Sequence, residues 1–196
     1  MTYRITVDEW RELERTSHDI KHEYIDGQVY AMSGGSLAHG RIGLNTCIAL
    51  ENALLARGKR CFVYNSDVAT RLSSKRYTYP DASVTCDERD QPAPDKTEVQ
   101  SPCVIVEVLS DSTEAYDRGK KFSYYRSCPT VQEYVIVATR YQTVEIYSRT
   151  SESWAYDAYG PDDVVEITSL DIRIPVIALY RNAGVPEGVD DLEGEV

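Results

Sequence analysis

Asp81, Glu107 and Lys121 are the residues whose types and order could perform hydrolytic chemistry. Two carboxylates at the ends of adjacent strands would form part of an oxygen cage, and this suits Mg²⁺ because the ion binds few carboxylates and keeps several waters. A lysine beside them could hold an attacking water and stabilise charge that develops on a phosphorus centre. Without a cation, two carboxylates about 4 Å apart would repel each other by roughly 4 kcal/mol at an effective dielectric constant of about 20. The set therefore predicts a site that binds a metal ion.

The run VIVEVL, from Val104 to Leu109, carries Glu107 as its only polar residue. Side chains alternate between the two faces of a strand, so Glu107 shares a face with Ile105 and Leu109. Because both faces are otherwise apolar, the run is typical of a central strand that is covered on both sides. An ionised carboxylate in that position is costly unless it is paired or binds a metal. Glu107 must therefore have a partner.

Structural alternatives exist for each of these residues. Glu107 could form a buried ion pair with Lys121 that has no catalytic role. Asp81 could be the acid of an ordinary Pro-Asp turn that accepts hydrogen bonds from nearby backbone N–H groups. Asp117 and Lys121, at i and i+4, could form a surface pair. The pair Tyr124-Tyr125 is better explained as half-buried packing, with its hydroxyls in water, than as a platform for stacking bases.

Local signals predict the elements of the first half of the chain. The pattern T-x-x-E at Thr6 is that of a capping box and predicts a short helix over residues 7–15. The dipeptide Asp26-Gly27 lies between two short runs, HEYI and QVYA, and indicates a tight hairpin. Apolar residues at helical spacing predict a long core helix over residues 36–57, which Gly58 ends.

The second half of the chain is expected to be mainly strands. CFVY, DVATRL and YTYPDASVTC come first, and Pro80 must interrupt the last of them because proline cannot donate to a ladder. A polar, proline-rich surface loop spans residues 87–101, and the strand with Glu107 then turns into a helix that carries Lys120 and Lys121. EYVIVA is another buried strand, TVEIYS, SWAYDAY and VVEIT resemble an antiparallel meander, and IPVIALYRNAG is a short closing helix. This order predicts a mixed α/β (α+β) fold with a central sheet between helices.

Composition and length predict a single domain over residues 1–185, followed by an acidic tail over 186–196 that we expect to be disordered. The tail holds five of the acids behind the net charge of −11, which otherwise argues against a partner with a phosphate backbone. A local basic strip could still exist, although scattered charges are the simpler interpretation. Its candidate members are Arg57, Lys59, Arg60, Arg71, Lys75 and Arg76.

The five cysteines are odd in number and form no C-x-x-C pair, which argues against a disulfide framework and a zinc site. We expect reduced, mostly buried thiols. No run is apolar for long enough to span a membrane, and the N-terminus resembles neither a secretory signal nor a transit peptide. These features favour a cytoplasmic location and no association with a membrane.

Three segments in order, YPD at 79–81, IVEVLS at 105–110 and STEAYDRGKKFSYYR at 112–126, resemble the Uma-type (Uma two) restriction endonuclease family, a branch of the PD-(D/E)XK nuclease superfamily. The resemblance extends to HEYIDGQVYAMSG and to His39, and covers residues 6–180. It implies a restriction-endonuclease-like core with an N-terminal hairpin and a C-terminal antiparallel meander.

The resemblance also implies roles for individual residues. Asp81 and Glu107 would be metal ligands, and the backbone carbonyl of Val108 would add a third oxygen. The superfamily pattern places a lysine two residues after this glutamate, where the chain has Leu109, and the Lys121-Phe122 position matches the lysine of this branch instead.

Three further positions are secondary candidates. Lys120 lies about 100° from Lys121 on a helix, so only one of the two can face Glu107. Glu23 and His39 match family positions and could add a ligand or contact substrate. Glu23 could equally be a solvated hairpin residue, and His39 is better explained as a helix N-terminal or core histidine.

Two functions follow from the resemblance. The first is a Mg²⁺-dependent endonuclease, with Mn²⁺ as a possible substitute, that hydrolyses phosphodiester bonds in DNA by metal-activated water and works most easily on duplex DNA as a two-fold homodimer. The second is a catalytically inactive module that keeps the nuclease fold and binds nucleic acid or a protein partner. The net acidity of the chain favours the second.

Overall fold

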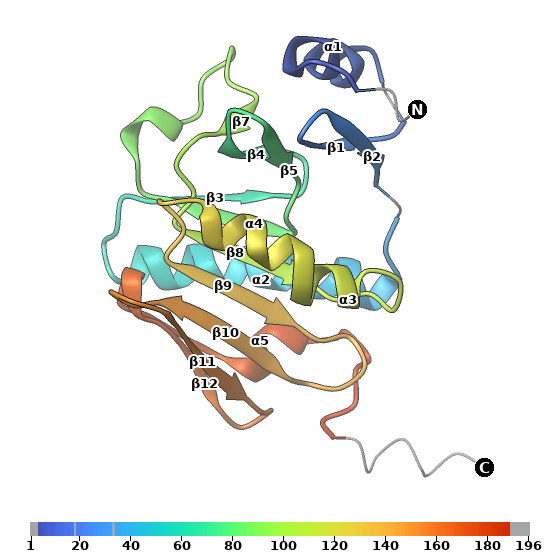
Figure 1. Cartoon of the computed structure of the whole chain (residues 1–196). Coiled ribbons are helices and arrows are strands. Elements are labelled where there is room, and N and C mark those ends of the chain that lie inside the picture. Colours follow the sequence, from blue (N-terminus) through green and yellow to red (C-terminus); the bar gives the residue numbers. More distant parts are fainter. Residues whose placement is uncertain (1–3, 18, 33, 189–196) are drawn as a thin grey trace, which may run out of the picture.

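The computed structural model describes residues 4–17, 19–32 and 34–188, and its centre is a six-stranded sheet (Figure 1). The strand order is β11-β10-β9-β8-β6-β3. The strands are β3 (Phe62–Asn65), β6 (Ala82–Thr85), β8 (Val104–Val108), β9 (Glu133–Val137), β10 (Val144–Arg149) and β11 (Trp154–Tyr159). The strand of Glu107, β8, runs antiparallel to β6 and parallel to β9, so it is central, as predicted. The sheet is mixed, and β9, β10 and β11 are antiparallel neighbours, of which β10 and β11 are the first two strands of the expected meander.

A second, five-stranded sheet has the order β2-β1-β5-β4-β7. Its strands are β1 (His22–Ile25), β2 (Gln28–Ala31), β4 (Ala69–Ser73), β5 (Arg76–Thr78) and β7 (Glu98–Val99). The predicted hairpin is confirmed, because Asp26 and Gly27 both have positive φ, 51° and 90°, between β1 and β2. The segment Tyr79–Asp81 leads from β5 in this sheet to β6 in the six-stranded sheet. Pro80 therefore lies where the chain changes sheets and no ladder bond is needed.

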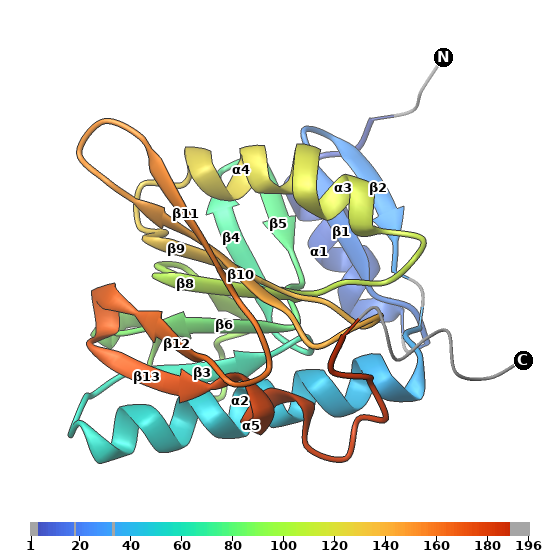
Figure 2. The same ribbon diagram turned by 90° about the horizontal axis from the view of Figure 1, so that it is seen from below.

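Helices cover both faces of the six-stranded sheet (Figures 1 and 2). On one face lies α2 (Leu37–Ala56), capped by Ser36, and on the other lie the segments that follow β8. Val104, Val106 and Val108 share a core with α2, whereas Ile105 and Leu109 pack with the tyrosines of the opposite layer. The predicted alternation along β8 is confirmed. The helix α1 (Val7–Thr16) begins with the predicted capping box between Thr6 and Glu9.

The segment after β8 is helical but not one regular α-helix. It consists of α3 (Glu114–Tyr116), a π-helical turn η2 (Asp117–Lys121) and α4 (Phe122–Ser127). Short π-helical turns often lie at functional sites, because they shift which side chains face the interior. The sequence gives no sign of this interruption, and it falls on the two candidate lysines.

One expectation about connections was wrong, and the predicted surface loop contains short ordered elements. VVEIT does not extend the meander: β12 (Val164–Ile167) pairs with β13 (Ile172–Pro175) in a separate two-stranded sheet, where Ile172 and Ile174 alternate into the core. The surface loop at 87–101 contains β7 and a 3-10 turn, η1 (Glu88–Asp90). The buried Asp90 side chain accepts hydrogen bonds from the backbone N–H groups of Gln100 and Ser101 and holds this loop. The closing helix α5 (Val176–Tyr180) follows Pro175 as predicted, after the 3-10 turn η3 (Thr168–Leu170).

The expectation that all cysteines are reduced was also wrong, because Cys61 and Cys86 form a disulfide. Cys61 precedes β3 and Cys86 follows β6, and these strands pair with Phe62 opposite Thr85. The next position of the same register places the two cysteines opposite each other. Cys47 and Cys103 are half-buried thiols and Cys128 is a buried one.

None of the helices in the described ranges is both long and apolar enough to cross a membrane. Of the tail predicted over residues 186–196, positions 189–196 lie outside the described residues.

Candidate active site

A cavity of about 450 Å³ brings together all the positions predicted for the site. It opens where the β1-β2 hairpin, the start of α2, the end of β8 and the π-helical turn η2 meet. Its walls include Glu23, His39, Asp81, Glu107, Val108, Lys120 and Lys121. These residues come from five separate segments, so only the tertiary fold brings them to one cavity.

Lys121, and not Lys120, faces Glu107. The Lys121 side chain is buried, with Nζ 2.8 Å from Glu107 Oε1 and 3.2 Å from Glu23 Oε1. Lys120 is exposed and lies at the wall of the cavity. Glu23 is buried, which rules out the solvated hairpin interpretation, and it also accepts a hydrogen bond from the backbone N–H of Tyr79.

Asp117 and Tyr125 belong to the same cluster, although neither was a predicted site residue. Asp117 Oδ1 is 3.7 Å from Lys121 Nζ and is buried, so their contact is not a surface pair. The hydroxyl of Tyr125, a buried residue, donates to Glu107 Oε1 at 2.5 Å. A spacing of i, i+4 and i+8 around Lys121 could have indicated both residues, because such positions share a helix face. The expectation of a wet, half-buried hydroxyl was wrong for Tyr125.

The electrostatics of this cluster are dominated by burial and an excess of acid. Burial raises the pKa of Glu107 to about 8, despite the opposing charge of Lys121. Burial also raises the pKa of Asp117. Burial opposes the charge of Lys121, but Glu107 and its neighbours hold the pKa of this ammonium well above its usual range. One ammonium group thus faces three carboxyl groups, those of Glu23, Glu107 and Asp117, and the raised pKa of Glu107 means that Lys121 does not fully compensate its ionised form.

Asp81 bonds to the neighbouring strand and not to its own turn. β6 begins at Ala82, opposite Val106, so the strand ladder ends before Val108 on this side. The Asp81 carboxylate takes that place: its Oδ2 accepts a hydrogen bond of 2.8 Å from the Val108 N–H. The same Oδ2 lies 3.4 Å from His39 Nε2, and the hydrogen bond to Asp81 raises the pKa of His39 against the effect of burial.

His39 therefore fits both its prediction as a helix N-terminal histidine and its prediction as a residue of the site. It lies in the first turn of α2, as a helix N-terminal histidine, and it also lines the cavity beside Asp81.

The donor set of the cavity is small for a metal site. Within residues 4–17, 19–32 and 34–188, no three His, Cys, Asp or Glu side chains form a group that could hold a metal ion on their own. Mg²⁺ differs from most metals in protein sites because one or two carboxylates, with waters and substrate oxygens, are enough to bind it. Asp81, Glu107 and the Val108 carbonyl satisfy that smaller requirement in donor chemistry, and the local excess of acid favours a cation.

Comparisons with known proteins give a family, two relatives of unassigned function and a solved structure. The model of the Uma2 family, described as "Putative restriction endonuclease", matches residues 7–176. "Uncharacterized protein slr1290" of Synechocystis sp. is 38% identical over 175 residues, which cover 88% of this chain and 88% of that protein. "Uncharacterized protein sll1609" of the same organism is 30% identical over 149 residues, or 76% of this chain and 82% of that protein.

A solved structure shares the fold. The crystal structure of "a putative nuclease belonging to DUF820" from Anabaena variabilis superposes with a TM-score of 0.71 at 18% identity, covering 90% of this chain and 97% of that chain. The restriction-endonuclease-like fold expected from the three sequence segments is thereby confirmed, and the residues of those segments form the cavity just described. With a family model that spans nearly all of the described chain, this protein belongs to the Uma2 family.

Proposed function

We propose that this protein is a metal-dependent endonuclease that hydrolyses phosphodiester bonds in DNA, with Mg²⁺ as its ion and Mn²⁺ as a substitute. The observation that carries the proposal is the convergence of Asp81, Glu107 and Lys121 on one cavity, with Lys121 Nζ 2.8 Å from Glu107. This is a variant of the PD-(D/E)XK arrangement in which the lysine comes from η2, because β8 has Leu109 at the usual position.

Asp81, Glu107 and the Val108 carbonyl are the groups that would hold the ion. When bound, the ion would lower the pKa of a water and neutralise charge on the phosphate. The buried acids supply the reason to bind it: Glu23, Glu107 and Asp117 surround one ammonium, and an ionised carboxylate in an apolar layer is costly without compensation. A divalent cation is the natural compensation.

The other side chains of the cavity position these groups. Tyr125 and Lys121 fix the Glu107 carboxylate, and His39 and the Val108 N–H fix Asp81. The Lys121 ammonium is held protonated by its acidic neighbours, so it can orient a water and stabilise negative charge on a phosphoryl group. Preorganised charge of this kind needs no rearrangement during the reaction.

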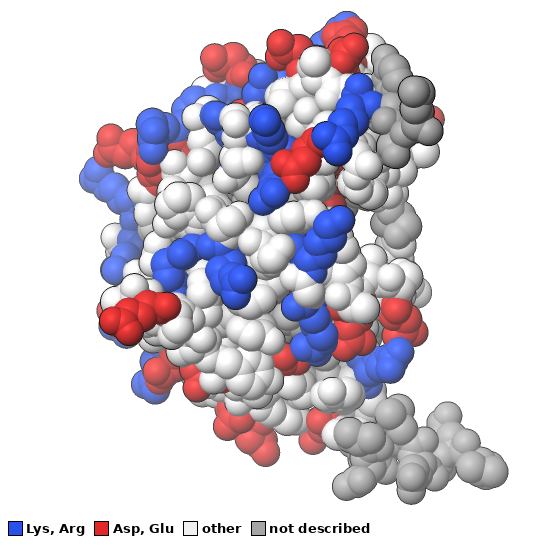
Figure 3. Space-filling model, in the orientation of Figure 1, with Lys and Arg blue, Asp and Glu red and all other residues white. Residues whose placement is uncertain are grey.

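A basic face beside the cavity supports a polyanionic substrate despite the net charge of −11. Figure 3 shows Lys and Arg side chains gathered over α4 and the neighbouring strands. Lys120 lines the cavity, and Arg126 and Arg149 line a groove between α4 and the β10-β11 hairpin. None of these three forms an ion pair with an acid of the described residues. Lys120 and Arg126 can therefore bind phosphates, whereas the Arg149 guanidinium already donates to the backbone carbonyls of Val131, Arg126 and Cys128. Of the basic strip that the sequence suggested, Arg76 lies beside this face, with its guanidinium 4.5 Å from the centroid of the Tyr124 ring of α4.

The test is DNA cleavage by matched variants. Duplex and single-stranded DNA are incubated with Mg²⁺ or Mn²⁺ and with wild type, Glu107→Ala, Lys121→Ala or the exposed control Glu88→Ala. We expect losses of about 100-fold or more for the two site variants, as for removal of a key electrostatic group, and wild-type rates for the control. Lys120→Ala, next to Lys121 in sequence, should lose much less. Equal background cleavage by wild type and both site variants would refute the proposal.

The second candidate is a nuclease-fold module that binds nucleic acid or protein without cleaving. One observation favours it: the Glu107 carboxylate is already paired with Lys121 and hydrogen bonded to Tyr125, so the site is partly satisfied without a metal. Calorimetry distinguishes the two. An absence of Mn²⁺ binding by a protein that still binds DNA or a protein partner supports the module, whereas binding that Asp81→Asn and Glu107→Gln each abolish supports the enzyme.

A further inference from the structure

The outer face of α2 exposes four large apolar residues in one stripe. Leu37 is 95% exposed, Leu44 52%, Ile48 42% and Leu55 68%. At about 100° per residue, these four positions fall within about 40° of the helix circumference. The residues through which α2 packs on the sheet, Ile42, Leu50 and Leu54, lie about 100–140° round the helix from the centre of this stripe. Figure 2 shows α2 at the edge of the molecule with no element outside it.

Two unpaired charges complete this stripe. Arg41 and Glu51 are both exposed and flank the apolar residues, one on each side. Neither forms an ion pair with any other residue in the described ranges. The six residues follow one another at alternating spacings of four and three, which is the spacing of a helix face that packs against another helix.

The stripe is symmetric about Thr46. Leu37 and Leu55 lie nine residues on either side of it, Arg41 and Glu51 lie five, and Leu44 and Ile48 lie two. In an antiparallel pair of identical helices, a residue at one distance before the centre meets the residue at the same distance after it. An isologous two-fold interface has this property: each contact between two positions is formed twice.

We propose that α2 is the homodimer interface and that its partner is α2 of a second copy, packed antiparallel about a two-fold axis at the level of Thr46. Leu37 then packs against Leu55 of the second copy and Leu44 against Ile48, so the apolar groups are buried in pairs. Arg41 meets Glu51 of the second copy, so both free charges are compensated. A different partner protein would have no reason to match this internal symmetry.

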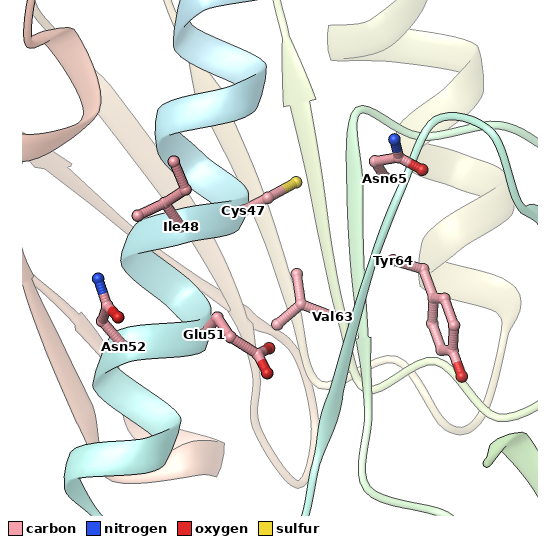
Figure 4. Close-up of a pocket in the computed structure, with 7 residues that line it drawn as sticks. All are labelled: Cys47, Ile48, Glu51, Asn52, Val63, Tyr64 and Asn65. Carbon is pink, nitrogen blue, oxygen red and sulfur yellow. The ribbon is translucent and has the colours of Figure 1, made fainter. Parts of the chain in front are cut away.

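The surroundings of the stripe leave room for such a partner. A side chain built at Gly40, at the edge of the stripe, would meet no atom within 4 Å. On the β3 side, a surface pocket of about 420 Å³ lies beside Glu51 (Figure 4). Figure 4 shows Cys47 and Glu51 on the side of α2 towards β3, with Ile48 further round the helix. No other part of the described chain covers the stripe.

The active-site cavity lies mainly on the other side of α2 from this interface, although a neighbouring pocket that shares His39 and Asp81 with the cavity reaches Leu44 of the stripe. His39, which lines the cavity, leaves α2 about 160° from the centre of the stripe, on the side of the buried residues. The proposal does not depend on nuclease activity, because the assembly can exist whether or not the cavity is catalytic.

Charge reversal tests the pairing directly. The full chain is measured by analytical ultracentrifugation over a concentration series, and wild type should sediment as a dimer of two 22.1 kDa chains. Arg41→Glu and Glu51→Arg each place like charges in contact twice per dimer and should weaken association by about tenfold or more. The double variant Arg41→Glu/Glu51→Arg restores opposite charges and should recover wild-type association.

Controls keep the result specific. Glu88→Arg and Glu152→Arg, which reverse exposed charges on elements other than α2, should leave the dimer unchanged. Leu44→Ser should weaken it independently of charge, and circular dichroism should show that each variant is folded. A monomeric wild type, or a double variant no better associated than the single ones, would overturn the proposal. A monomeric wild type would indicate instead that residues of the same chain cover the stripe.

Discussion

At the scale of single residues, the site depends on how the buried Glu107 carboxylate is satisfied. Three groups contribute: the Lys121 ammonium at 2.8 Å, the Tyr125 hydroxyl at 2.5 Å and, in the proposed holoenzyme, a metal ion. Because burial raises the pKa of Glu107 to about 8, the folded protein binds a proton here that the unfolded chain releases at lower pH. The ionised form therefore costs stability as the pH rises towards 8, and donors to the carboxylate reduce that cost.

Tyr125→Phe measures this contribution. In the presence of a chelator, its loss of stability should be about 1 kcal/mol at pH 6, where Glu107 is protonated, and about 1.5–3 kcal/mol at pH 9, where the bond is to a charged acceptor. Tyr134→Phe is the matched control, since the buried Tyr134 hydroxyl donates to the backbone carbonyl of Asp117, which is neutral at both pH values. Urea denaturation at both pH values gives the comparison. A loss for Tyr125→Phe that does not grow with pH would contradict the role assigned to Tyr125.

At the scale of elements, strand register decides what the sequence order leaves open. The pairing of β3 with β6 carries Cys61 to Cys86, and the same β6 begins where Asp81 can reach β8. One strand thus holds both the disulfide at its end and the first carboxylate of the site at its start. The π-helical turn η2 acts in the same way on the other side, because it holds Lys121, and not Lys120, buried against Glu107.

The disulfide can be checked by counting thiols. In denaturant without reductant, a thiol titration should detect three groups, those of Cys47, Cys103 and Cys128, and five after reduction. Cys86→Ser should raise the count in unreduced protein to four, because it releases the Cys61 thiol. Removing the cross-link should also lower stability by about 2–4 kcal/mol. Five thiols in unreduced wild type would show that β3 and β6 are not cross-linked.

At the scale of the whole molecule, the two proposals combine in the type of DNA break. Two cavities on one two-fold dimer could cut both strands of a duplex in one encounter, whereas a monomer cuts one strand at a time. Supercoiled plasmid should therefore be converted largely to linear DNA by wild type and to nicked circles by Arg41→Glu. The double variant Arg41→Glu/Glu51→Arg should restore linear product. If all three proteins cleave the plasmid with the same ratio of linear to nicked product, the dimer does not determine the type of break. If none of them cleaves, the result contradicts the nuclease proposal and leaves the dimer proposal intact.

The sequence by itself determined the elements that depend on neighbouring residues. Thr6 and Glu9 form the predicted capping box, Asp26-Gly27 forms the hairpin, and the alternation from Val104 to Leu109 places Glu107 in a central strand. Each of these depends on interactions over a few positions, which a pattern of residue types records. The family and its fold also followed from three short segments, since their order and spacing carry more information than any single motif.

Only the tertiary structure decided which of these residues meet. Helix geometry decides that Lys121, and not Lys120, pairs with Glu107 and that Asp117 and Tyr125 join the site. Strand register decides that Asp81 bonds to Val108 and that Cys61 pairs with Cys86. The sequence contains hints of some of these contacts, such as the i, i+4 and i+8 spacing of Asp117, Lys121 and Tyr125, but it could not fix them, because a change of one residue in register or one extra residue in a helical turn alters every contact while the pattern of residue types stays the same.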